Sequence, residues 1–142
     1  MKRFLAVSFC LVLSVVALGA QSRSAAPFKA RLSPLGVTGA TVNTITGLGA
    51  VTATLTGATL AIDGTFEGLT GVATAANVRR GPKAIPGPVV FDLEFTKASS
   101  GHVSGTLTLT PEQIADLNAG RLYVQIHSER APDGSIRGWL LK

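Results

Sequence analysis

Few side chains in this sequence could carry out chemistry. Its 142 residues include two histidines, His102 and His127, and one cysteine, Cys10. A catalytic base or a metal site would have to use His127, with Gln125, Glu129 or His102 as partners. The simpler interpretation is that His127 is a strand residue hydrogen-bonded to the backbone or to a neighbour. Copper chemistry normally uses more imidazoles than this sequence offers, so we expect neither a bound metal nor a cofactor.

Two pairs of carboxylates could in principle act as general acid and base. Asp63 and Glu67 are four residues apart and Asp92 and Glu94 are two apart, so each pair falls on one face of a strand. Acidic residues that alternate with apolar residues on a solvated strand produce the same spacing, and this interpretation is favoured. The sequence contains no nucleophile elbow, phosphate-binding loop or metalloprotease motif. We therefore expect a protein that is not an enzyme.

The densest positive charge in the sequence lies at Arg79, Arg80 and Lys83. An anionic polymer, a phosphate or an acidic partner could dock there, although a solvated loop is the simpler interpretation. The chain has 13 Lys and Arg against 8 Asp and Glu, and loss of Lys2 and Arg3 with a leader would leave a formal charge of +3. With so little charge and no aromatic residues among the basic ones, nucleic acid is a poor candidate partner.

The N-terminus has the pattern of a secretory signal peptide. Lys2 and Arg3 precede an apolar run over Phe4–Leu18, and small residues follow. The run of fifteen residues is shorter than the roughly 20 that a membrane span needs. We expect cleavage after Ala20, and cleavage after Gly19 stays open.

This pattern divides the chain into a signal peptide at residues 1–20, an exposed lead-in at residues 21–27 and a single domain at residues 28–142. The mature protein would be secreted or periplasmic, would have no membrane span, and would lack Cys10 and hence any disulfide. A lipid anchor on Cys10 is a less favoured alternative, because the apolar stretch before it is too short.

Short strands separated by turns dominate the remaining sequence. The density of β-branched residues predicts two or three strands over residues 37–62. Alternation of apolar and polar residues predicts further strands at residues 28–32, 60–68, 73–79, 89–95, 102–109, 121–128 and 135–141. Turn signals such as Gly81-Pro82 and Pro86-Gly87-Pro88 lie between them.

One helix is expected among these strands. Thr110 can cap it, Pro111 suits its first position and Gly120 can end it. The predicted fold is therefore all-β, an antiparallel Greek-key-like β-sandwich or barrel of about seven to nine strands with one short helix near residues 110–119.

The chain should end in a β-hairpin whose turn is Ala131-Pro132-Asp133-Gly134. Tyr123, Gln125 and His127 share one face of the first strand, and Arg137 and Trp139 share one face of the second. We expect these two faces to coincide across the hairpin, so that the five side chains hold it together.

This ending resembles the C-terminal signature of the CHRD domain, a family named after chordin that includes many secreted microbial proteins. The residues that carry the resemblance are Gly120-Arg121-Leu122-Tyr123-Val124-Gln125-Ile126-His127-Ser128 and Ala131-Pro132-Asp133-Gly134-Ser135-Ile136-Arg137-Gly138-Trp139-Leu140. The segments 68–71, 87–90 and 110–117 also fit, so the similarity spans Phe28 to Leu141. Because chordin is an extracellular binder of growth factors, the resemblance implies binding rather than catalysis.

Departures from the family pattern affect the expected site. Many microbial members of the family have a pattern similar to Ala-His-Ile-His-Gly. At the corresponding position this chain has Asn77 and Arg79 in place of the two histidines. An arginine would repel a cation, which puts any family metal site in doubt. The candidate ligand-binding residues are Asn77, Arg79, Arg80, Gln125, His127 and Arg137.

The function expected from the sequence is that of an exported, non-enzymatic binding or structural module of the CHRD type. Its partner would be an extracellular or envelope protein or a polysaccharide. The alternative is a metal-binding or redox domain, with copper or zinc held in a sandwich similar to that of superoxide dismutase; the histidine-rich family members are the reason for considering it.

Overall fold

The computed structural model describes residues 26–142. In this part of the chain the elements are β1 (Phe28–Pro34), β2 (Leu48–Thr56), β3 (Thr59–Glu67), β4 (Ala73–Arg80), β5 (Val89–Asp92), β6 (Glu94–Phe95), β7 (Gly101–Thr108), α1 (Pro111–Asn118), β8 (Leu122–Ser128) and β9 (Ala131–Trp139). The predicted all-β fold with one short helix is confirmed. The expected signal peptide and most of the lead-in lie outside the described residues.

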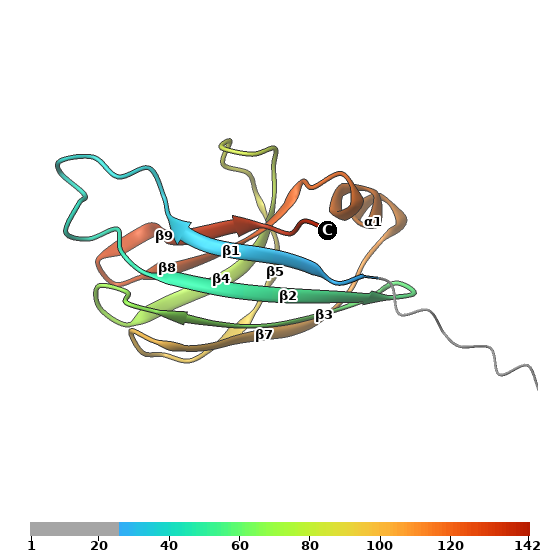
Figure 1. Cartoon of the computed structure of the whole chain (residues 1–142), viewed down its shortest axis with the longest axis horizontal. Helices are drawn as coiled ribbons and strands as arrows, with labels where there is room; N and C mark the ends of the chain where they lie inside the picture. The colour runs from blue at the N-terminus through green and yellow to red at the C-terminus, as the bar shows by residue number, and fades with distance from the viewer. Residues whose placement is uncertain (1–25) are drawn as a thin grey trace, which may run out of the picture.

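The strands form one sheet that closes almost completely into a barrel (Figure 1). Their order is β5-β4-β8-β9-β1-β2-β3-β7-β6, and all neighbours are antiparallel. Only Leu93 separates β5 from β6, so the segment predicted as one strand over residues 89–95 pairs with β4 at one end of the order and with β7 at the other. This shared segment brings the two ends of the sheet together.

The period-two alternation of the strands places the apolar residues inside the barrel. On β1, Phe28 and Leu32 are buried while Lys29 and Arg31 are exposed. On β3, Leu60, Ile62 and Phe66 are buried as predicted. Aliphatic side chains from both halves of the sheet therefore make one core, and the outward positions carry the polar residues.

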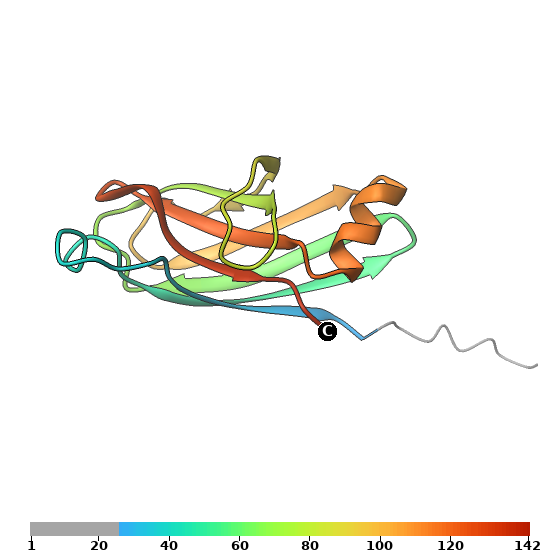
Figure 2. The ribbon, with the colours of Figure 1, turned by 90° about the horizontal axis from the view of Figure 1, so that it is seen from above.

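The helix α1 lies at one end of the strands (Figure 2). Thr110 caps it as predicted: the Gln113 N–H donates to Thr110 Oγ1 at 3.2 Å, and the Thr110 N–H donates to Gln113 Oε1 at 2.9 Å. Gly120, at φ +69, follows the end of the helix. Leu117 of the helix joins the core, so α1 covers this end of the barrel.

The terminal hairpin has its turn earlier than the sequence indicates. The chain turns at Glu129 and Arg130, and Ala131 already pairs with Ser128, so the expected turn at residues 131–134 is wrong. Pro132, Asp133 and Gly134 form an irregular part of β9 instead. Gly134 has φ +124, a backbone conformation that favours glycine at this position.

Candidate functional site

Five of the six candidate residues lie on the outer face of β4, β8 and β9. Across neighbouring strands, Asn77 is opposite Gln125, and Gln125 is opposite Arg137. Arg79 is two residues from Asn77 on β4, and His127 is two residues from Gln125 on β8. Because side chains two residues apart on a strand point to the same side, Arg79 and His127 belong to the same face.

Arg80 does not join this group, because neighbouring positions on a strand point to opposite faces. Its Nε lies 2.8 Å from Oδ2 of Asp116 on α1, and its Nη2 lies 3.4 Å from Glu112. Asp116 is buried in the last turn of the helix, where a negative charge is unfavourable, and Arg80 compensates that charge. In this structure Arg80 therefore attaches α1 to β4.

A buried polar network surrounds His127. Its Nδ1 lies 2.8 Å from the carbonyl oxygen of Pro132, and its Nε2 lies 3.3 Å from Gln125 Nε2 and 3.5 Å from Asn77 Nδ2. Because a carbonyl only accepts, Nδ1 carries the proton, and the lone pair of Nε2 faces the two amide donors. The expected hydrogen bond from His127 to the backbone is confirmed. Arg79 completes the network by donating from Nε to Asn77 Oδ1 at 2.9 Å.

His102 lies on β7, whose neighbours are β3 and β6, so it does not join His127. Within residues 26–142, no group of three or more histidine, cysteine, aspartate and glutamate side chains is arranged to hold a metal ion.

Tyr123, expected from the sequence to share a face with Gln125 and His127, lies on this face, and the loop over residues 81–88 covers it, a contact that the sequence did not indicate. The Gly87 N–H donates to Tyr123 Oη at 2.9 Å, and Arg79 Nη1 donates to the Gly87 carbonyl at 3.0 Å. Trp139 Nε1 donates to the carbonyl of Gly81 at 2.9 Å. The loop is thus folded onto the sheet, and Tyr123 is fully buried outside the hydrophobic core.

The predicted coincidence of the two hairpin faces is confirmed. Tyr123 pairs with Trp139, and their ring centroids are 4.8 Å apart with the planes tilted by 37°. The guanidinium carbon of Arg137 lies 5.3 Å from the centroid of the Trp139 ring. Trp139 therefore contacts Tyr123, Arg137 and the loop together.

Beside this face, β1, β9 and the loop border an open groove of about 500 Å³, which we call the basic groove. Its charged lining residues are all cations: Lys29, Arg31, Lys83 and Arg137. The ion pairs formed among residues 26–142 are made by Arg80 and Arg121, so none of them neutralises a cation of the groove.

Comparison with protein families identifies the chain. The model of the CHRD domain matches residues 28–140, nearly all of the described part. The chain belongs to the CHRD domain family. Comparisons with curated proteins and with solved structures found no match.

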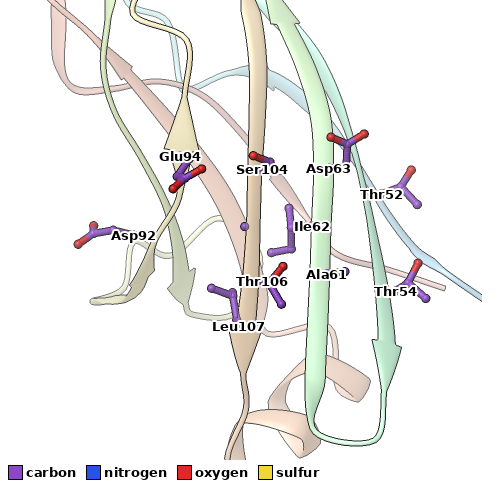
Figure 3. A pocket seen from close by; sticks show the side chains of 11 residues that line it. Thr52, Thr54, Ala61, Ile62, Asp63, Asp92, Glu94, Ser104, Thr106 and Leu107 are labelled. Atoms are coloured by element: carbon purple, nitrogen blue, oxygen red, sulfur yellow. The ribbon is translucent and has the colours of Figure 1, made fainter.

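The CHRD domain has a second groove, of about 720 Å³, over β2, β3, β7 and the β5–β6 segment (Figure 3). We call it the acidic groove, because its charged lining residues are Asp63, Asp92 and Glu94. Asp63 and Glu94 both pair with Ser104, from its two sides, so the structure brings together one member of each carboxylate pair seen in the sequence. The two grooves meet at the β1–β2 pair, where Lys29 of the basic groove is opposite Thr52 of the acidic groove.

No α-helix in the described part of the CHRD domain is both long and apolar enough to span a membrane.

Proposed function

We propose that this CHRD domain is an exported, non-enzymatic binding module that holds an anionic partner in the basic groove. The observation that carries the proposal is the gathering of Lys29, Arg31, Lys83 and Arg137 around one groove whose lining contains no carboxylate. Like charges held together repel one another, and an anion between them removes that repulsion.

Folding does not require these cations to be where they are. Lys29 and Arg31 point away from the core, and Lys83 is exposed in the loop. Their neighbours Phe28, Ala30 and Leu32 provide the buried contacts of β1. The charges therefore contribute little to packing, which favours a role in binding.

One cation of the groove is held in place before any partner binds. Arg137 is half-buried, and its guanidinium lies over the ring of Trp139. Trp139 is itself fixed by Tyr123 and by its hydrogen bond to Gly81. A side chain that is already ordered loses less conformational entropy on binding, so this arrangement favours recognition of an anion.

The non-enzymatic part of the proposal is supported by the environment of His127. Both ring nitrogens already have partners in the buried network, and the side chain is 7% exposed. Export is supported by the sequence pattern of residues 1–20.

Export and binding are tested on the same preparation. The full chain would be expressed in a secreting host, and the intact mass of the exported protein would be measured. We expect loss of the first 20 residues, or of the first 19. Full-length protein that stays in the cytoplasm would contradict export.

Binding is measured on three immobilised polyanions: polygalacturonate, polyglutamate, and vesicles containing phosphatidylglycerol. We expect retention on at least one of them and elution by salt, because screening weakens exposed charge pairs. The double variant Arg31→Gln/Lys83→Gln should elute at lower salt. The matched control Lys97→Gln/Arg130→Gln removes two exposed cations elsewhere and should elute like the parent protein. Equal elution of both double variants would refute the basic groove as the site.

A further inference from the structure

The cations of the basic groove come from three parts of the chain: β1, β9 and the loop over residues 81–88. Lys29 and Arg31 are two residues apart on the outer face of β1, so their Cα atoms are about 6.6 to 6.8 Å apart. Arg137 of β9 and Lys83 of the loop also border the groove. A long ligand with repeated negative charges can contact all four side chains, whereas a compact anion contacts one or two.

We infer that the partner is an acidic polysaccharide that lies along β1 in the basic groove, and this inference rests on the proposed function. Its carboxylate or sulfate groups match the planar donors of Arg31 and Arg137, which can form two parallel hydrogen bonds to such an oxyanion. The hydroxyl of Ser33, which is opposite Arg137 and also lines the groove, provides a neutral partner for sugar hydroxyls.

An acidic peptide fits the groove less well. Extended peptides commonly bind by adding a strand to an open sheet edge. Both sides of β1 are occupied, by β2 over Phe28–Leu32 and by β9 at Ser33 and Pro34. A bridge between Lys29 and Leu141 extends the second side. A peptide would therefore have side-chain contacts alone and would lose the main-chain hydrogen bonds that normally provide its affinity.

A single-stranded nucleic acid also fits less well. Such ligands stack their bases on free aromatic rings. Trp139, the aromatic residue that lines the groove, already contacts Tyr123 and Arg137 and is hydrogen-bonded to Gly81. Phosphate groups could contact the cations, but a base would have to compete with Tyr123 and Arg137 for the Trp139 ring.

An anionic membrane surface fits poorly for a geometric reason. The cations line a hollow between β1, β9 and the loop, and a flat bilayer cannot enter it. A single polysaccharide chain can enter, since the volume of about 500 Å³ is in the range that sites for small organic ligands have, about 300 to 1,000 Å³.

The experiment is calorimetric titration of the exported protein with polygalacturonate, with neutral dextran as the matched uncharged polymer. Dextran sulfate distinguishes sulfate from carboxylate recognition, and polyglutamate, an oligodeoxythymidine and phosphatidylglycerol vesicles represent the competing ligand classes. We expect the tightest binding to one of the two acidic polysaccharides and no binding to dextran. The double variant Arg31→Gln/Lys83→Gln should weaken that binding about tenfold, and Lys97→Gln/Arg130→Gln should leave it unchanged.

Each outcome decides between the inference and the function on which it rests. Groove-dependent binding to polyglutamate, the oligonucleotide or the vesicles that exceeds binding to both polysaccharides would overturn the inference and leave the proposed function intact. Absence of binding to every polyanion would overturn both. Binding to an acidic polysaccharide that the groove variant leaves unchanged would also overturn both, provided that circular dichroism shows the variant folded.

Discussion

Replacing Arg137 by Met separates the contribution of its charge to stability from its contribution to binding. The guanidinium carbon lies 5.3 Å from the centroid of the half-buried Trp139 ring, and the charge has no carboxylate partner among residues 26–142. A cation–π contact of this exposure contributes roughly 0.5 to 1 kcal/mol. Because Met retains an aliphatic side chain of similar length, we expect the free energy of unfolding to fall by about that amount.

The assay is thermal unfolding followed by circular dichroism. For a domain of this size, the loss corresponds to a decrease in Tm of about 2 to 6 °C. Arg137→Lys keeps a cation near the ring and should recover part of the decrease. Arg130→Met, in the exposed turn between β8 and β9, is the matched control and should leave the Tm unchanged.

Two results would refute the reasoning about Arg137. A decrease in Tm above about 10 °C would mean that the guanidinium holds a network larger than one contact with Trp139. An unchanged Tm would mean that the cation–π contact contributes nothing. In either case, weaker retention of Arg137→Met on polyanions would still be expected from its place in the basic groove.

Three further predictions concern residues of β8 and β9. Gly138→Ala would place a Cβ 2.8 Å from a backbone carbonyl carbon of β1, and chemical denaturation should show a loss of about 1 to 3 kcal/mol. In the control variant Gly36→Ala, the added Cβ would meet no atom within 4 Å, so the free energy of unfolding should not fall. Equal losses of stability in the two variants would contradict this account of packing. Tyr123→Phe leaves the Gly87 N–H without its acceptor, so we expect a loss of about 1 kcal/mol and faster proteolysis within residues 81–88; unchanged proteolysis would count against the loop contact. Calorimetry of the parent protein should show copper and zinc binding weaker than about 1 μM, and nanomolar binding that disappears in His127→Ala would contradict the assignment of both ring nitrogens to the buried network.

Much of the local structure could be predicted because it depends on residues close in sequence. The alternation along β1 and β3 determines which side chains face the core, and the capping residues around Thr110 determine where α1 begins. The β-branched composition of residues 37–62 predicted two or three strands, and the structure has two that begin there, β2 and β3, with no strand over residues 37–47. There, Thr38 and Thr41 bond to each other and form a turn, which competes with strand pairing.

The irregular part of β9 shows why the hairpin turn was misplaced. Pro132, Asp133 and Gly134 have the composition of a turn, but the carbonyl groups of Pro132 and Asp133 accept hydrogen bonds from His127 and Gln125. These bonds come from the outer face of β8 and hold the segment against it. Composition indicates that the backbone bends here, whereas the side chains of the neighbouring strand decide that the bend lies within β9.

The sequence by itself determined that Lys29, Arg31 and Arg137 point away from the core, because successive residues of a strand point to opposite faces. Only the tertiary structure decided that these residues share a groove. Ser33 and Arg137 are far apart in the chain, and they become neighbours because β1 pairs with β9 within the sheet that closes into the barrel. Closure depends on the register of every strand pair around the barrel, and a register between distant strands is set by packing of the whole core rather than by any local pattern.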